Sequence, residues 1–287
     1  MFETKRIRIG NQTSFSAVPI LLPFEYAVAH GFDAFEWLPD KNESGEGWTE
    51  EDISKETRAI VRETAREKGI ILSVHASLRS NPLKQKGDEL FTKGIEFARD
   101  IGAALFNIHF FPGEGIGAYV ESIVPLVELL SRSAIKLSIE NIPETSPRDF
   151  NGLFGYLADH HSPYVSFIGM CLDIGHANLC DSTRNDYLKY IDSLDPGVPI
   201  IHMHVHENYG DYDSHLPIFT GPARKDPSGI RSLIGRMKKR GFSGSIILEQ
   251  WPEPADLLDE ARDRLLGMIG SSRARQQRFC REHRASE

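Results

Sequence analysis

The chain has 287 residues, of which 40% are hydrophobic and 26% are charged, and its formal net charge is −8 at pH 7. This composition can support a full hydrophobic core, and it disfavours binding to a nucleic-acid backbone by general electrostatic attraction. The three cysteines, the polar N-terminal segment and the lack of an apolar run near the roughly 18 residues of a membrane span predict a soluble, cytoplasmic protein without a membrane partner.

Short apolar runs alternate with polar segments of helical periodicity along most of the chain, a pattern typical of repeated βα units with a parallel sheet. The expected strands are residues 6–10, 33–38, 70–75, 104–110, 136–141, 167–173, 200–206 and 245–250. Eight strands with intervening helices predict an α/β fold, namely one closed (β/α)8 TIM barrel that forms a single catalytic domain over residues 1–270.

The best-marked helix lies between the second and third expected strands. Thr49 is its expected N-cap and Gly69 its expected end, because glycine readily takes the left-handed conformation that follows a helix. Later helices are expected at about residues 85–101, 117–132, 147–161, 184–193, 227–240 and 254–268. The pattern is lost in residues 271–287, an Arg-rich C-terminal extension that we expect to be a solvated or partly helical tail.

Residues that can bind a metal ion end or follow seven of the apolar runs. They are His75, His109, Glu140, Asp173, His176, His202, His204, His206, Asp213, His215 and Glu249. If the runs are successive parallel strands, these side chains converge on the carboxyl-terminal face of the barrel, where such folds keep their active sites. The sequence therefore predicts a metal-dependent enzyme.

The histidines of the seventh strand, at positions 202, 204 and 206, share one face of that strand. Same-face neighbours lie about 6.6 Å apart, so at most one of the three should bind a given ion directly, and a satisfied polar core is the alternative. Cys171, inside an apolar run, is expected to pack as a small hydrophobic side chain rather than to bind metal.

Glu140 and Glu249 each follow an apolar run, where an unpaired carboxylate is costly to bury. An arginine or lysine could offset that cost, but none stands at the neighbouring strand ends. We therefore predict a divalent metal site. Its expected ligands are Glu140, Asp173, His204 and Glu249, a mixed oxygen and nitrogen set that suits Mn²⁺, Co²⁺ or Zn²⁺.

The motifs SIEN (138–141), LDIGH (172–176), HVHEN (204–208) and DSHLP (213–217), in this order, resemble the xylose isomerase-like TIM-barrel superfamily. That superfamily includes sugar isomerases and epimerases, inosose isomerases and dehydratases, and the abasic-site nucleases of the endonuclease IV type, also called AP endonuclease family 2. The resemblance extends from Ile7 to about Trp251. It implies one divalent ion on the four predicted ligands, with Glu140 and Glu249 as the catalytic acid and base.

The nuclease branch implies a cluster of three zinc ions, whose additional ligands would fall on His75, His109, His176, Asp213 and His215. All of these residues are present, so ligand identity does not separate the two branches. The segment ENYGDY does, because its acidic residues Glu207 and Asp211 should not lie against phosphates. We note two departures from the sugar branch: no Gly-x-Gly follows HLP soon after, and Tyr209 and Gly210 stand where ketose 3-epimerases place an arginine.

The expected function is a divalent-metal-dependent isomerase or epimerase of a sugar or sugar-like carbonyl compound. The reaction would pass through a metal-stabilised enediolate, with Glu140 and Glu249 removing and returning the proton. The alternatives are a metal-dependent abasic-site endonuclease, which is a phosphodiesterase, and a sugar dehydratase, which is a lyase. The expected partner is a small sugar-like substrate, with a homo-oligomer possible and nucleic acid not favoured.

Several further residues are expected to contact substrate. We expect His109 and His176 to orient hydroxyl groups and His75 to lie at the pocket floor, unless His75 is a hydrogen-bonded core histidine. His206 is a further candidate for metal or substrate binding. Glu36 and Trp37 at the end of the second strand would shape the sugar site, with a core position as the alternative for Trp37. Arg224, or its neighbour Lys225, would anchor the substrate unless it is a solvated loop charge.

Overall fold

The computed structural model describes residues 6–13, 15–42, 44–84 and 89–284, and side chains up to residue 270. Within these residues, eight parallel strands form a closed barrel in which each strand pairs with the next and β8 pairs with β1. The strands are β1 (Arg8–Gln12), β2 (Ala34–Trp37), β3 (Ile71–His75), β4 (Leu105–His109), β5 (Lys136–Glu140), β6 (Ile168–Asp173), β7 (Ile200–Val205) and β8 (Ser245–Leu248). The predicted (β/α)8 barrel is confirmed.

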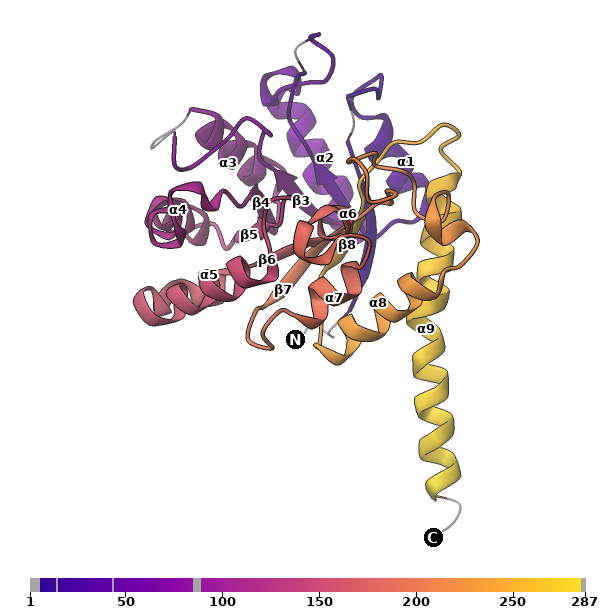
Figure 1. The fold of residues 1–287 in the computed structure, drawn as a ribbon. Coiled ribbons are helices and arrows are strands. Elements are labelled where there is room, and N and C mark those ends of the chain that lie inside the picture. Colours follow the sequence, from indigo (N-terminus) through magenta and orange to yellow (C-terminus); the bar gives the residue numbers. More distant parts are fainter. Residues whose placement is uncertain (1–5, 14, 43, 85–88, 285–287) are drawn as a thin grey trace.

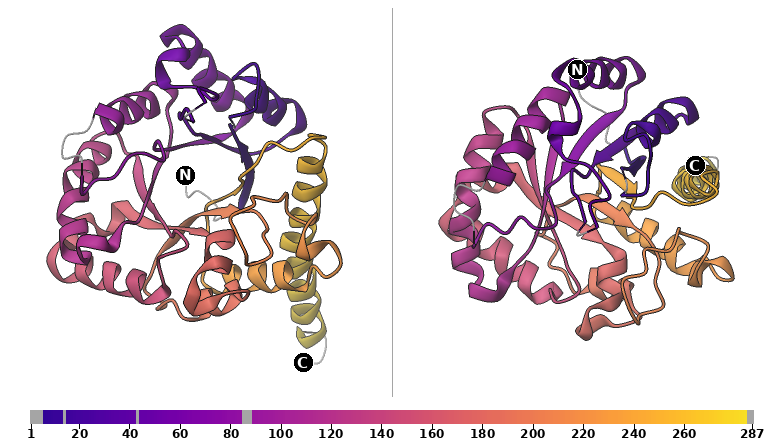
Figure 2. Two further views of the ribbon diagram at one scale, coloured as in Figure 1. Left: turned by 45° about the horizontal axis from the view of Figure 1, so that its top comes forward. Right: turned by 90° about the horizontal axis from the view of Figure 1, so that it is seen from above.

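Helices surround the barrel, as the views of Figure 2 show. They are α1 (Leu22–His30), α2 (Lys55–Lys68), α3 (Glu89–Ile101), α4 (Ile116–Ser131), α5 (Pro147–His160), α6 (Ile174–Leu179), α7 (Tyr187–Asp192), α8 (Ser228–Lys239) and α9 (Leu257–Arg284). The sequence reading missed α1 and the short α6. Of the expected helix at 85–101, residues 85–88 lie outside the described part of the chain.

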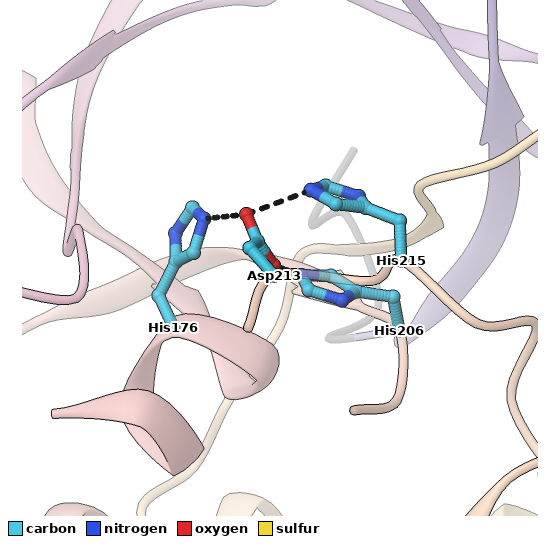
Figure 3. Close-up of side chains that lie close together, drawn as sticks. All are labelled: His176, His206, Asp213 and His215. Atoms are coloured by element: carbon cyan, nitrogen blue, oxygen red, sulfur yellow. Dashed lines mark hydrogen bonds and ion pairs between the residues drawn. The ribbon is translucent and has the colours of Figure 1, made fainter. Parts of the chain in front are cut away.

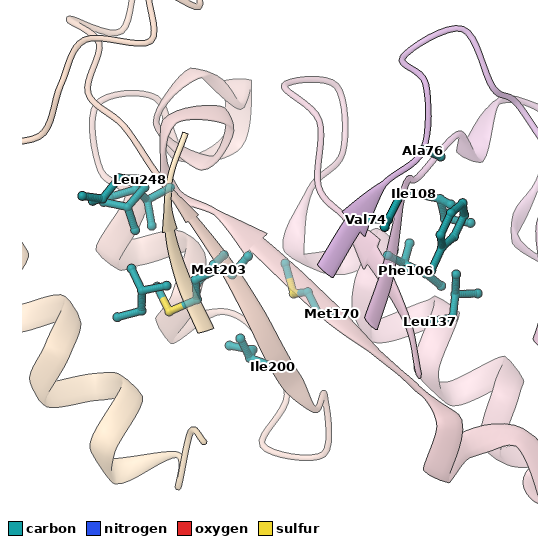
Figure 4. Packing of buried hydrophobic residues seen from close by; sticks show 14 of the residues in the cluster. Val74, Ala76, Phe106, Ile108, Leu137, Met170, Ile200, Met203 and Leu248 are labelled. Atoms are coloured by element: carbon teal, nitrogen blue, oxygen red, sulfur yellow. The ribbon is translucent and has the colours of Figure 1, made fainter. Parts of the chain in front are cut away.

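Alternation along the strands separates an apolar layer from a polar interior. One set of side chains packs against the helices and is almost completely buried, as Figure 4 shows for members such as Val74, Phe106, Ile108, Leu137, Met170, Met203 and Leu248. Most of the residues between them are polar and buried in the barrel, and several form hydrogen bonds across strands. Ser138 Oγ, for instance, donates to Asn107 Oδ1 at 2.6 Å.

Two expected boundaries differ in the structure. Thr49 forms a capping box with Asp52, but this box starts a short 3₁₀ helix (Glu50–Asp52), because Ile53 is extended and interrupts the helix. The α2 helix starts after Ser54, whose side chain accepts from the Thr57 amide, and ends before Gly69 in the left-handed conformation, as expected. The first strand is shifted by two residues from the expected 6–10, so Gln12 belongs to it.

The last helix, α9, continues past the expected end at residue 268 and carries the C-terminal extension (Figure 1). The predicted domain boundary at residue 270 therefore falls inside a helix. The structure does not describe the side chains of residues 271–287. Among the described helices, none is both long enough and apolar enough to span a membrane.

Candidate metal centre

The four predicted metal ligands meet at the carboxyl-terminal end of the barrel. Glu140 ends β5, Asp173 ends β6, His204 lies on β7 and Glu249 follows β8. Each offers one ligand atom, and these atoms all lie within 4.8 Å of one another. His204 Nδ1 is 3.3 Å from Glu140 Oε2 and 3.4 Å from Glu249 Oε1. We call these four residues the central cluster.

The central cluster has the unsatisfied atoms that a cation would complete. Glu140 Oε1, His204 Nδ1 and Glu249 Oε2 are buried without a hydrogen-bond partner. Glu140, Asp173 and His204 have no exposed surface, and the charged partners found for the three carboxylates in the described structure are histidines. Burying such atoms unpaired costs about 1–3 kcal/mol each, and more when they are charged. The donor set therefore fits a divalent ion.

Glu36 supports the central cluster from deeper in the barrel. Its Oε1 lies 2.7 Å from His204 Nε2, and its Oε2 accepts from Ser73 Oγ and lies 2.9 Å from His202 Nε2. A carboxylate on the second ring nitrogen of a metal-binding histidine fixes the ring orientation. Glu36 has no exposed surface. The structure thus places it behind His204, rather than in a sugar site, because β2 turns it into the barrel.

A second group, the outer cluster, consists of His176, His206, Asp213 and His215 (Figure 3). Asp213 Oδ2 lies 3.1 Å from His176 Nε2 and 3.0 Å from His215 Nε2. The rings of His206 and His215 are stacked with centroids 3.9 Å apart. His206 Nε2 also lies 3.2 Å from Asp173 Oδ2, so the outer cluster adjoins the central one.

The short helix α6 positions His176. Asp173 caps this helix by accepting from the His176 amide. His176 Nδ1 then donates to the Asn141 carbonyl at 2.8 Å, which leaves Nε2 for the outer cluster. A Cβ at Gly175 would lie only 1.9 Å from His206 Cε1. The role of Gly175 is to let the His206 ring approach the backbone closely.

A third group, the side cluster, consists of His75, His109 and Glu140. His75 Nδ1 donates to the Ala76 carbonyl, and its Nε2 lies 3.0 Å from Glu140 Oε2. His109 Nε2 lies 3.8 Å from Glu140 Oε1. Glu140 therefore belongs to both the central and the side clusters, and the three groups form one continuous set of potential ligands.

The charges in this set are strongly coupled. Burial raises the pKa of Glu140, but the charge of His204 and the hydrogen bonds of His176 and His204 outweigh burial and hold that pKa well below its usual value. Burial lowers the pKa of His109 to about 3, so His109 is neutral at pH 7. Burial also lowers the pKa of His215, but Glu249 and Asp213 outweigh it and raise that pKa to about 9.

A cavity of about 410 Å³ opens onto this set of residues. It is lined by Gln12, Thr13, Phe15, Leu38, Leu78, His109, His176, Asp213, His215, Glu249, Gln250 and Trp251. Glu249 reaches this cavity, whereas Glu140 is fully buried and does not line it. The sequence reading missed Gln12, Gln250 and Trp251 as site residues, although all three stand at strand ends, which is the signal that identified the histidines.

Other residues that were expected to contact substrate do not line this cavity. Trp37 has no exposed surface and packs in the core against Phe24, Phe35, Trp48 and Phe97, because alternation on β2 turns it away from the barrel interior. Arg224 is exposed on a 3₁₀ turn (Pro222–Arg224), and neither it nor Lys225 lines the cavity.

Two further residues have structural roles. Glu207 is buried and accepts from the amides of Gly221 and Ala223, so its charge stabilises a loop. Cys171 lies near His202 and His204, but burial raises the pKa of its thiol well above the usual value, so it stays protonated. Its complete burial agrees with the expected packing role.

Comparison with solved structures shows the same fold. A D-tagatose 3-epimerase-like protein superposes with a TM-score of 0.68 at 20% identity, over 92% of this chain and 99% of that chain. D-psicose 3-epimerase, solved in the presence of D-fructose, gives a TM-score of 0.62 at 15% identity, over 92% and 99% of the two chains.

Sequence comparison gives the family. The L-ribulose-5-phosphate 3-epimerase UlaE of Escherichia coli O1:K1 / APEC is 23% identical over 258 residues, covering 83% of this chain and 86% of that protein. An uncharacterized protein of Methanocaldococcus jannaschii is 30% identical over 130 residues, which span 43% of this chain but only 40% of that protein. A family model described as xylose isomerase-like TIM barrel matches residues 24–267. The protein therefore belongs to the xylose isomerase-like TIM-barrel family.

Proposed function

We propose that the protein is a divalent-metal-dependent isomerase or epimerase of a sugar or sugar-like carbonyl compound. The observation that carries the proposal is the central cluster, whose buried, unpaired ligand atoms adjoin a cavity of about 410 Å³ through Glu249. The names of relatives support the same reaction class, since they include L-ribulose-5-phosphate 3-epimerase and D-psicose 3-epimerase.

The residues divide into holding and proton-transfer roles. Glu140, Asp173, His204 and Glu249 would hold the ion, which when bound supplies charge that polarises a substrate carbonyl and lowers the pKa of the adjacent C–H group. Glu249 faces the cavity and is the candidate to remove that proton. Glu140, on β5, is proposed to act on the other side of the ion through its unpaired Oε1. Neutral His109 and the nearby His176 would orient hydroxyl groups of the substrate.

The test is exchange of a substrate carbon-bound hydrogen with deuterated solvent, followed by nuclear magnetic resonance. Metal-loaded protein should catalyse exchange at the carbon beside the carbonyl of a ketose, and Glu249→Gln should lower the exchange rate by at least about 100-fold, the usual effect of losing a general base. Arg224→Gln is the control, because Arg224 is exposed away from the cavity. Unchanged exchange in Glu249→Gln, with the control also unchanged, rejects the role. Loss of water from the product would instead identify a dehydratase.

A second candidate is a metal-dependent phosphodiesterase acting at abasic sites. One observation favours it: the central, outer and side clusters adjoin, so that together they could hold more than one ion. The acidic Glu207, which argued against this function, is also turned into a loop. Binding and cleavage of an abasic duplex at low salt would support this candidate, and two or three tightly held zinc ions per chain would agree with it.

A further inference from the structure

The two halves of the barrel contribute different chemistry to the cavity. The metal-binding groups His109, His176, Asp213 and His215 come from the ends of β4, β6 and β7. The other half, formed by β8, β1, β2 and β3, contributes Glu249 and seven uncharged residues, which are Gln12, Thr13, Phe15, Leu38, Leu78, Gln250 and Trp251. Because the barrel is closed, these halves face each other. The seven uncharged residues of the second half carry no formal charge, and we call them the neutral wall.

The neutral wall does not offer what a phosphate group requires. Phosphate is held by arginine or lysine side chains, or by free amides at a helix N-terminus. No lysine or arginine lines the described part of the cavity. Arg79 follows Leu78 in the sequence, but its guanidinium lies 3.4 Å from Asp40 Oδ1 and its side chain is 62% exposed. Lys41, three residues after Leu38, pairs with Asp52 at 2.9 Å.

Two amide side chains in the neutral wall are unsatisfied. The Oε1 atoms of Gln12 and Gln250 are buried without a hydrogen-bond partner, and Gln12 as a whole is only 5% exposed. A buried carbonyl oxygen without a hydrogen bond costs free energy. A ligand that donates a hydrogen bond to this oxygen recovers that free energy. Hydroxyl groups can donate such a hydrogen bond, whereas a phosphate dianion has only hydrogen-bond acceptors.

The remainder of the neutral wall is apolar. Phe15, Leu38, Leu78 and Trp251 line the cavity beside the two glutamines. Tyr26 packs edge-on against Trp251, with centroids 5.4 Å apart, which holds the indole in place. Aromatic and aliphatic surfaces pack well on the C–H face of a sugar ring or chain. A charged group of the substrate that lay against the same surface would lose its water, which costs free energy.

Building on the proposed function, we propose that this cavity takes an uncharged polyhydroxylated substrate, part of which is bound by Gln12, Gln250 and the apolar surface of the neutral wall. Phosphorylated sugars are then excluded. The proposal gives Gln12 and Gln250 a role in specificity, because their carbonyl oxygens would accept hydrogen bonds from hydroxyl groups in a cavity whose described lining has no cationic side chain to bind a phosphate.

The experiment is calorimetric titration of Mn²⁺-loaded protein with matched pairs, L-ribulose against L-ribulose 5-phosphate and D-psicose against D-psicose 6-phosphate. The neutral member of a pair should bind at least about tenfold more tightly than the phosphorylated one. Gln12→Leu should weaken the neutral sugar by about tenfold, as expected for one lost hydrogen bond to a buried group. Tighter binding of the phosphorylated members, or an unchanged neutral affinity in Gln12→Leu, overturns the proposal.

A second variant covers the case in which Gln12→Leu fails to fold. Leu78 lies at the rim of the cavity and is 45% exposed, so it can be replaced with little risk to the core. Leu78→Arg should bring the phosphorylated member of a pair to within a few-fold of the neutral one, and Leu78→Gln, of similar polarity without charge, should not. Equal effects of the two replacements contradict the proposal, since charge would then not be the missing element.

The deuterium-exchange assay separates this proposal from the proposed function. Exchange that occurs only with phosphorylated sugars leaves the isomerase or epimerase function standing and overturns the neutral-substrate proposal. Exchange with neutral sugars that depends on Gln12 supports both. Absence of binding and exchange for all four sugars, in protein that holds Mn²⁺, counts against both.

Discussion

His204 Nε2 lies 2.7 Å from Oε1 of Glu36, and neither residue has any exposed surface. This contact directs the other ring nitrogen, Nδ1, toward Glu140 and Glu249. Burial raises the pKa of the Glu36 carboxyl, but the charges of His204 and His202 and their hydrogen bonds outweigh burial and hold it well below its usual value. Glu36 is therefore an ionised group that orients His204, one of the four proposed metal ligands.

We predict that replacing Glu36 weakens metal binding, and that losing both its charge and its hydrogen-bond acceptor weakens binding more than losing the charge alone. Glu36→Leu should lower metal affinity by roughly 10- to 100-fold, the usual effect of losing such a partner. Glu36→Gln, which keeps an acceptor for the histidine N–H, should retain more affinity. Titration with a competing chelator measures both, and circular dichroism checks the fold. A Leu variant that binds Mn²⁺ as tightly as the wild type would exclude the positioning role.

Zinc binding at the outer cluster should depend on pH, because His215 must lose a proton when it binds the ion. Its pKa of about 9 in the metal-free protein means that the ring is protonated at pH 7. A raised pKa stabilises the metal-free fold below about pH 6.5, and this contribution is lost as the pH rises through about 9. A metal ion displaces the same proton, so the zinc affinity of this cluster should increase as the pH rises toward about 9.

Calorimetry in two buffers of different ionisation enthalpy measures the protons released on zinc binding. The His215→Asn variant should release about one proton fewer than the wild type at pH 7 for the same number of bound ions. Equal proton release by the two proteins would show that His215 does not exchange its proton for zinc.

Removing the metal should reduce stability, because it leaves buried carboxylates facing one another. Loading with Mn²⁺ at about 100 times its dissociation constant should stabilise the folded state by about 2.7 kcal/mol, seen as a higher melting temperature. Asp173→Asn should lose most of this increase, since Asp173 is a completely buried member of the central cluster. A mutation on the exposed α8–α7 contact, Arg236→Gln, should keep it, because Arg236 pairs with Asp192 away from the cluster. Equal loss in both variants would contradict the assignment.

Gly175 should not tolerate a side chain. Gly175→Ala would place its Cβ 1.9 Å from His206 Cε1, so the ring or the α6 backbone must move. We expect a loss of about 1–3 kcal/mol in the free energy of unfolding, together with weaker zinc binding by the outer cluster. Gly155→Ala is the matched control, because Gly155 lies on α5 and a Cβ there meets nothing within 4 Å. Chemical denaturation measures the free energy of unfolding of both variants. Equal values would argue against the close approach of His206 to Gly175.

The sequence by itself was enough for the barrel and for the composition of its site. Apolar runs of strand length alternate with helical segments, and the ligand-type residues stand at their ends, so the convergence of Glu140, Asp173, His204 and Glu249 could be anticipated before any coordinates. The short helix α6 was missed because its six residues are too few to show a helical period.

The tertiary structure alone decided how each side chain is used. Strands of a parallel barrel are buried on both faces, so alternation shows that Glu36 and Trp37 point in opposite directions but not which of them enters the barrel. The close approach of Gly175 to His206 and the turning of Glu207 into a loop depend on atoms distant in the sequence. Local pattern determines which residues stand at the strand ends, whereas long-range packing determines which atoms meet.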